Sequence, residues 1–242
     1  MWYWLFKYIF MGPLLAMLGR PRVEGLEYVQ RSGPAILASN HLAVADSFYL
    51  PLVVRRRITF LAKAEYFTGT GLKGWFIRWF YSTTGQVPID RSDTDTAQAA
   101  LETAERLLRQ GKLLGIYPEG TRSPDGRLYK GKTGLARVAL HTGVPVIPVA
   151  MIGTDVVNPP GSKVWRFGRV TVRFGKPMDF SRFDGLAGNR FIERAVTDEV
   201  MYELMRLSGQ EYVDIYATDI KDGGNGASSA SDVARIPETA AG

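Results

Sequence analysis

A histidine and an aspartate close together in the sequence form the first group of residues that could perform chemistry. His41 and Asp46 lie in NHLAVAD, directly after the apolar run AILAS, which is typical of a buried strand. An aspartate can fix the tautomer of an imidazole and stabilise its protonated form, while the free ring nitrogen takes a proton from an alcohol. A regular helix would turn the two side chains onto different faces, so we expect His41 to precede the helix. Alone, such a pair is more often structural than catalytic.

Two further segments carry arginines that could bind phosphate. YPEGTRS (residues 117–123) follows another predicted strand; its glycine lets the backbone approach a ligand, and Arg122 can make two hydrogen bonds to a phosphate. GQVPIDR (residues 85–91) ends in Arg91. Taken singly, the first segment could be a turn with a solvated arginine, and the second could end in a surface ion pair between Asp90 and Arg91.

A fourth segment, VPVIPV, completes a pattern of ordered blocks. Prolines are unusual in a central strand, so this segment predicts a strand edge or a bend that lines a site, with plain core as the alternative. Together the four blocks, spread over about residues 33–154, resemble in order and spacing the glycerolipid acyltransferase family typified by bacterial PlsC-like 1-acyl-sn-glycerol-3-phosphate acyltransferases. The chain is most similar to actinobacterial, mycobacterial-type members. Tyr117 departs from the phenylalanine of many relatives, which should alter packing and not chemistry.

The resemblance implies a function and a set of site residues. It implies transfer of a fatty acyl group from an acyl thioester to a hydroxyl of lysophosphatidic acid, giving phosphatidic acid in phospholipid biosynthesis. The expected donor is acyl-CoA as a co-substrate, with acyl carrier protein as the alternative, and no cofactor is needed. The catalytic pair falls on His41 and Asp46. The residues expected to bind the phosphate and glycerol of the acceptor are Arg91, Glu119, Gly120, Thr121, Arg122 and Lys132.

Other functions remain open at this point. Glycerol-3-phosphate, a lysophospholipid or a glycolipid could replace lysophosphatidic acid as the acceptor. A membrane-bound esterase or thioesterase could use the same base to activate water, and it would release thiol without an acceptor. A lipid-binding protein without catalysis would have no reason to combine the His–Asp pair with the phosphate arginines.

Composition narrows the chemistry further. The chain has no cysteine and two histidines, which excludes a thiol nucleophile and makes a zinc site improbable, so we expect no metal. We expect a structural role for the second histidine, His141, near the end of a predicted helix. The net charge of +6 favours anionic partners, and an acidic membrane surface fits better than nucleic acid because no nucleic-acid-binding motif accompanies the charge.

Two segments rich in tryptophan predict contact with a membrane. Residues 1–18 are almost wholly apolar and contain Trp2 and Trp4, with Pro13 expected to kink or split the helix. We interpret them as an uncleaved monotopic anchor, with a transmembrane span or a helix packed on the core as alternatives. Trp75 and Trp79 lie among cations in residues 71–81, where a core helix is the alternative. The expected location is the cytoplasmic face of the cell membrane.

Apolar runs alternate with helical periodicity along the rest of the chain. The pattern predicts an α/β fold with a mostly parallel central sheet flanked by helices, like that of glycerol-3-phosphate acyltransferases, behind the N-terminal anchor helix. The anchor is assigned to residues 1–19, the catalytic domain to 20–220 and a disordered tail to 221–242. Strands are predicted at residues 35–39, 58–62, 86–89, 112–117, 144–152 and 170–174, and the clearest helices at about 92–110, 132–142 and 191–207.

Overall fold

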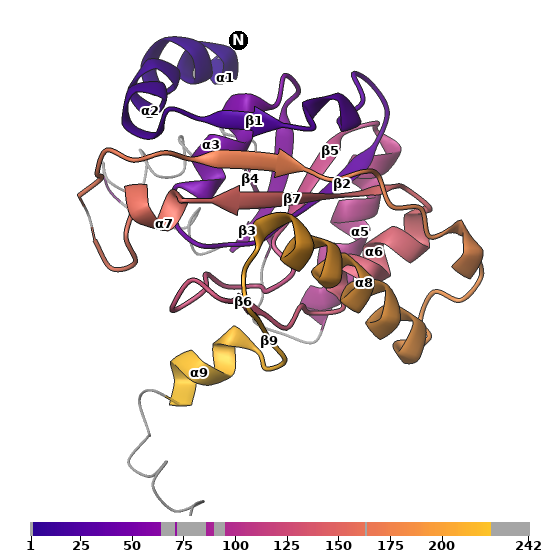
Figure 1. The fold of residues 1–242 in the computed structure, drawn as a ribbon. Helices are drawn as coiled ribbons and strands as arrows, with labels where there is room; N and C mark the ends of the chain where they lie inside the picture. The colour runs from indigo at the N-terminus through magenta and orange to yellow at the C-terminus, as the bar shows by residue number, and fades with distance from the viewer. Residues whose placement is uncertain (1, 64–70, 72–85, 90–94, 163, 224–242) are drawn as a thin grey trace, which may run out of the picture.

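The structure is a computed structural model, and it describes residues 2–63, 71, 86–89, 95–162 and 164–223 (Figure 1). Its main sheet has seven strands in the order β1-β8-β7-β2-β5-β3-β4. Neighbouring strands are parallel except β7 and β8, which are antiparallel. The predicted mostly parallel α/β architecture is therefore confirmed. The strands are β1 (Arg22–Glu24), β2 (Ala35–Ser39), β3 (Ile58–Lys63), β4 (Gln86–Ile89), β5 (Leu113–Ile116), β7 (Val146–Ile152) and β8 (Thr171–Phe174).

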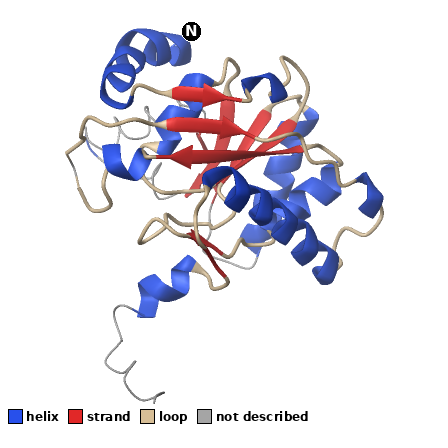
Figure 2. Ribbon diagram, viewed as in Figure 1, coloured by secondary structure: helices blue, strands red, loops and turns tan. Residues whose placement is uncertain are grey.

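Helices cover both faces of this sheet (Figure 2). Side chains alternate along β2, so Leu37 packs into the core shared with α2 and α3, while Ile36 packs into the core shared with α5, α6 and α8. The helical segments are α1 (Trp2–Leu5), η1 (Phe6–Met11), α2 (Gly12–Gly19), η2 (Leu26–Tyr28), α3 (Asp46–Val53), α5 (Asp95–Arg109), α6 (Gly134–Thr142), α7 (Thr154–Val157), η4 (Ser181–Phe183), α8 (Arg190–Ser208) and α9 (Ala217–Gly223).

Local signals explain several helix ends. The Asn189 side chain accepts hydrogen bonds from the backbone N–H groups of Phe191 and Ile192 and so begins α8. Gly143 ends α6 in the left-handed conformation, as predicted. This helix begins at Gly134, two residues later than expected, because the Lys132 N–H donates to the Pro118 carbonyl at 2.8 Å and keeps its residue in the preceding loop.

The N-terminal segment is a helical arm that lies partly on the domain. A π-helical stretch, η1, separates α1 from α2 and ends just before Pro13, which lacks the N–H that a regular helix would use. Leu15 is buried, and its carbonyl accepts a hydrogen bond from the Tyr49 hydroxyl at 3.0 Å. The outer face exposes Tyr8, Ile9, Leu14 and Met17. Among the helices of the described residues, none is long and apolar enough to cross a membrane.

A second, small sheet lies below the main one in Figure 1 and was not predicted. It pairs β6 (Leu128–Tyr129) with β9 (Tyr212–Val213) in parallel. Helix α9 follows β9 and extends to Gly223, so residues 221–223 are helical and not part of a disordered tail as the sequence suggested. The rest of that predicted tail, residues 224–242, lies outside the described residues.

Candidate active site

The predicted pair of His41 and Asp46 is brought together just beyond the carboxyl end of β2. The His41 Nδ1 lies 2.8 Å from the Asp46 Oδ2. That same carboxylate oxygen accepts hydrogen bonds from the backbone N–H groups of Leu42, at 2.7 Å, and Ala43, at 2.8 Å. The backbone bends between the two residues, and Asp46 is the first residue of α3, as the offset between them required. The favourable N-terminal end of the helix dipole adds to the stabilisation of the carboxylate.

This geometry assigns the ring nitrogens of His41 to different tasks. A carboxylate only accepts hydrogen bonds, so Nδ1 carries the ring proton and donates a hydrogen bond to Asp46. The Nε2 is then unprotonated in the neutral ring and can accept a proton from a substrate. The Asp46 side chain is fully buried, whereas that of His41 is 15% exposed, so only the histidine is accessible from outside.

Tyr117 fixes the imidazole from a second direction. Its ring stacks on that of His41, with centroids 3.9 Å apart and planes 11° from parallel. Its hydroxyl lies 3.1 Å from the Ser47 Oγ, one helical residue beyond Asp46. Burial raises the pKa of Tyr117 well above its usual range, so the phenol stays neutral. The Asp46 carboxylate contacts the edge of the imidazole and the Tyr117 phenol covers one face. Together they restrict rotation of the His41 ring.

Glu119 joins the histidine loop to two other segments. Its Oε1 accepts from the His41 backbone N–H and its Oε2 from that of Tyr129, each at 3.0 Å. The Ser123 N–H donates to the His41 carbonyl at 2.7 Å and strengthens the connection. Burial raises the pKa of the Glu119 carboxyl to about 7, against the opposing effect of the two backbone donors. In this geometry Glu119 acts chiefly on the protein backbone around the histidine.

The loop of residues 120–122 contains three of the residues predicted to bind the phosphate and glycerol, and Lys132 lies against it. Gly120 has a φ of +72°, and a Cβ atom there would lie 3.2 Å from the Lys132 Cδ, so glycine lets Lys132 lie against this loop. The Thr121 Oγ1 accepts a hydrogen bond from Lys221 at 2.9 Å. No ion pair between described residues involves Arg122 or Lys132. Among the described residues, therefore, no carboxylate pairs directly with either of these two cations.

Asn40 is a site residue to which the sequence gave no role. Its side chain is buried and makes a pair of hydrogen bonds with the backbone of Met151, at 2.7 and 2.9 Å, and a third with Gln210 at 2.7 Å. The residue thus ties the end of β2 to the end of β7. The proline-containing β7 is an internal strand, not an edge, and its ladder with β8 begins at Val149, one residue after Pro148.

The remaining predicted residues are Arg91 and the four tryptophans expected to contact the membrane. Arg91, Trp75 and Trp79 lie outside the described residues. Trp2 lies in α1, and Trp4 follows it with an exposed side chain that stacks on Tyr8. Within the described part of the chain, no group of His, Cys, Asp and Glu side chains could hold a metal ion.

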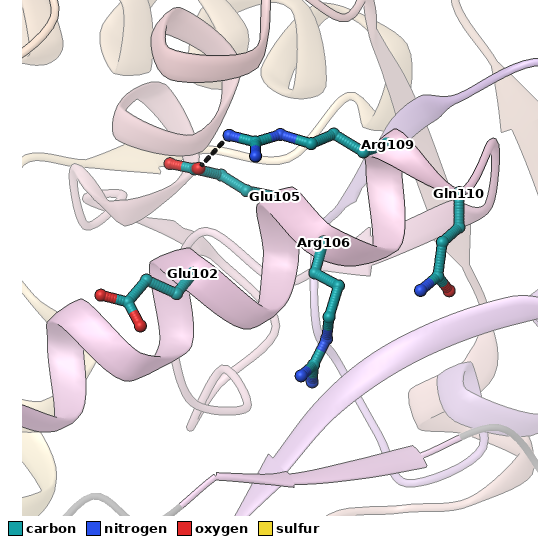
Figure 3. Close-up of a pocket in the computed structure, with 5 residues that line it drawn as sticks. All are labelled: Glu102, Glu105, Arg106, Arg109 and Gln110. Atoms are coloured by element: carbon teal, nitrogen blue, oxygen red, sulfur yellow. Dashed lines mark hydrogen bonds and ion pairs between the residues drawn. The ribbon is translucent and has the colours of Figure 1, made fainter.

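A hollow on the outer surface of α5 is separate from these residues (Figure 3). Its lining contains both signs of charge, and Glu105 and Arg109 form an ion pair at 2.9 Å one helical turn apart. None of the predicted site residues lines it. Its side chains are Glu102, Glu105, Arg106, Arg109 and Gln110.

The structure thus combines a mostly parallel sheet with a His–Asp pair at a strand end, its aspartate fully buried, and a cationic loop beside it. Residues 20–152 match the family model described as Acyltransferase. Because the match covers more than half of the chain, the protein belongs to this acyltransferase family.

The relatives place it with PlsC-like proteins. It is 36% identical over 166 residues to the chloroplastic 1-acyl-sn-glycerol-3-phosphate acyltransferase LPAT1 of Arabidopsis thaliana, covering 68% of this chain and 45% of that protein. It is 29% identical over 133 residues to the 1-acyl-sn-glycerol-3-phosphate acyltransferase of Borreliella burgdorferi, covering 55% of this chain and 51% of the relative. The chain thus spans about half the length of these curated relatives.

A solved structure supports the same family assignment. The 1-acyl-sn-glycerophosphate (LPA) acyltransferase PlsC of Thermotoga maritima matches with a TM-score of 0.61 and 27% sequence identity, covering 83% of this chain and 79% of that one. The resemblance inferred from the sequence blocks is therefore confirmed. The actinobacterial subtype stays a prediction.

Proposed function

We propose that the protein transfers a fatty acyl group from an acyl thioester to the free hydroxyl of lysophosphatidic acid, producing phosphatidic acid. The observation that carries the proposal is the 2.8 Å contact between the His41 Nδ1 and the Asp46 Oδ2, with that oxygen also held by two backbone N–H groups. It leaves the Nε2 of His41 as a base of fixed orientation. The matched relatives are named for this reaction, which supports the choice of acceptor.

The proposed step balances with the residues at hand. The acceptor oxygen attacks the thioester carbonyl carbon while the His41 Nε2 takes its proton, and Asp46 stabilises the resulting imidazolium. The tetrahedral intermediate collapses, the carbon–sulfur bond breaks, and the imidazolium returns its proton to the leaving thiolate. General-base catalysis of this kind contributes roughly 10²- to 10⁴-fold. Positioning and stabilisation of the oxyanion supply the remainder.

The structure narrows where the oxyanion can be bound. The backbone N–H groups of His41, Leu42 and Ala43 already donate to the Glu119 and Asp46 carboxylates. The Gly120 N–H donates to the Tyr117 carbonyl at 3.0 Å. These four N–H groups are therefore engaged in hydrogen bonds that hold the loops, so other donors must stabilise the oxyanion.

We assign the phosphate of the acceptor to the loop of residues 120–122. Arg122 and Lys132 bring positive charge beside the His–Asp pair, and Arg91 is the further ligand implied by the family resemblance. A phosphate monoester suits such a cluster because an arginine can make two parallel hydrogen bonds to it. Acyl-CoA is the proposed donor, with acyl carrier protein as the alternative.

We propose that the protein acts at the cytoplasmic surface of the cell membrane. The exposed side of the N-terminal arm is apolar and aromatic. The segment after α7 extends this character, because Val164 and Phe167, both 70% exposed, stand close in sequence to the exposed Arg166 and Arg169. Helices α2 and α7 contact each other, and the Gly168 N–H donates to the Leu18 carbonyl at 2.9 Å, so arm and segment are neighbours. Aromatic and aliphatic side chains with cations suit an anionic interface.

The deciding experiment is acyl transfer by detergent-purified protein from palmitoyl-CoA to lysophosphatidic acid and to glycerol-3-phosphate, beside His41→Ala. The proposal expects phosphatidic acid from the wild type and a loss of about 10²-fold or more in the variant. A preference for glycerol-3-phosphate would make that compound the assigned acceptor. Release of thiol without any acceptor would indicate a hydrolase. Equal activity of the wild type and a folded variant would refute the role of His41.

A further inference from the structure

Lys221, on helix α9, contacts the loop proposed to bind the acceptor phosphate. Its Nζ donates to the Thr121 Oγ1 at 2.9 Å and to the carbonyl oxygen of Arg122. The residue lies about 70 positions beyond the end of the family match at residue 152. It is therefore a contribution to the site from a part of the chain that the sequence blocks do not include.

Two connections hold α9 in this position. The Lys130 N–H donates to the carbonyls of Val213 and Ile215, both at 3.1 Å, just before α9 begins. Ala217, the first residue of the helix, is fully buried. The small sheet anchors this segment to β6, which contains Tyr129, the residue whose N–H donates to Glu119. Helix α9 is thus built onto the same framework as the His41 loop.

The charges at this contact are unbalanced. Burial and the neighbouring Arg122 charge both lower the pKa of Lys221, and Glu119 only partly opposes them. Glu119 is not a direct partner, because its oxygens accept from two backbone N–H groups and it forms no ion pair with Lys221 among the described residues. Lys221 and Arg122 repel each other at this loop, and a bound anion would offset that repulsion because it attracts both cations.

The donor geometry points to the same ligand. An ammonium group has three N–H bonds, and Lys221 uses two of them on the loop. The third is left for a ligand at this loop, in which Arg122 is exposed. Hydrogen bonds from charged donors to phosphate oxygens are about twice as strong as neutral ones.

We propose that Lys221 binds the phosphate of the acceptor together with Arg122, so that α9 completes the acceptor site. The proposal rests on the proposed function, since it takes lysophosphatidic acid as the ligand. It adds a residue that determines specificity for phosphorylated acceptors.

The test measures binding and turnover separately in the full chain. Lys221→Gln and Lys221→Arg are compared with Lys176→Gln, which removes an exposed lysine after β8. The dissociation constant for lysophosphatidic acid in detergent micelles is measured without thioester, and the KM for each substrate is measured with palmitoyl-CoA. We expect Lys221→Gln to weaken lysophosphatidic acid binding and raise its KM about tenfold, leaving the KM for palmitoyl-CoA unchanged. Lys221→Arg should restore most of the affinity, and Lys176→Gln should match the wild type.

Two results would overturn the inference. Unchanged affinity in a folded Lys221→Gln protein would show that the lysine does not touch the phosphate. A fall in kcat with unchanged affinity would show that it only positions the loop. Failure of the proposed function has a different signature: the wild type would bind lysophosphatidic acid more tightly than Lys221→Gln yet form no phosphatidic acid.

Discussion

The Asp46 carboxylate is the residue on which the geometry of the proposed base depends most. In Asp46→Asn, an amide oxygen can still accept hydrogen bonds but carries no charge to stabilise the imidazolium. We expect kcat for acyl transfer to fall by roughly 10²- to 10⁴-fold. Because His41 and Asp46 act as one unit, the double variant with His41→Ala should be no slower than His41→Ala alone. Losses that multiply in the double variant would contradict this arrangement.

Glu119 should make stability depend on pH in a defined direction. Its folded-state pKa of about 7 lies above the ordinary value of 4.5, so between these values the folded protein keeps a proton that the unfolded chain has lost. The stabilisation from this proton is complete below pH 4.5 and disappears as pH rises through 7. The unfolding free energy therefore falls with rising pH by up to about 1.4 kcal/mol per pH unit from this group.

Glu119→Gln tests this directly. The protonated carboxyl of the wild type at pH 5 still offers an oxygen to each of the two backbone N–H groups, whereas the amide sets its NH2 group against one of them, so the variant should lose about 1–3 kcal/mol at pH 5. The variant's side chain at position 119 does not titrate, whereas the wild type loses stability as pH rises. The difference in unfolding free energy between the two proteins, measured by urea unfolding, should therefore shrink between pH 5 and pH 8. A difference independent of pH would mean that Glu119 is ionised throughout.

Sequence predicted only some of these residues, for a physical reason. His41 and Asp46 were accessible because residue type and short spacing suffice to suggest a proton-transfer pair. Asn40 and Lys221 make their contacts with residues 111 and 100 positions away, respectively. No local pattern encodes such contacts, because they exist only once the sheet order brings the segments together.

Among the elements, the N-terminal arm shows how closely a helix can be fitted to the domain. A Cβ atom on Gly19 would lie 2.2 Å from the Tyr49 hydroxyl oxygen, which donates to Leu15. Gly19→Ala should therefore displace Tyr49 and cost about 1–3 kcal/mol of stability. The matched control is Gly134→Ala at the start of α6, where no atom lies within 4 Å and alanine should be neutral or slightly stabilising. Equal melting temperatures for the two variants would contradict the tight fit.

Periodicity predicted the larger elements and missed the small ones. Six of the seven strands of the main sheet and helices α5, α6 and α8 have enough residues to show an apolar pattern, whereas the three-residue β1 was not predicted. The two-residue strands β6 and β9 do not, since their pairing depends on segments far apart in the chain. The π-helical turn η1 was also missed: Pro13 predicted a disruption, but not that the helix would absorb it by widening a turn.

At the scale of the whole molecule, one side combines the arm with the segment after α7. Replacing Val164 and Phe167 together by serine should weaken sedimentation with vesicles containing anionic lipid, because two exposed apolar side chains are lost from the proposed contact. Phe191→Ser is the matched control: this side chain is 84% exposed on α8, a helix that lies away from the arm and α7 in Figure 1. If the control loses as much vesicle binding as the double variant, the assigned surface is wrong.

The position of β2 between β5 and β7 also determines when the catalytic framework can form during synthesis. The hydrogen bonds between Asn40 and Met151 cannot form until Met151, 111 residues further along the chain, has been synthesised. At roughly 5–20 residues per second, that interval is about 6 to 22 s. A nascent chain therefore carries its N-terminal arm and the proposed catalytic histidine well before the neighbouring strand that secures the histidine loop. Any product of premature termination before β7 would keep the arm but lack this framework.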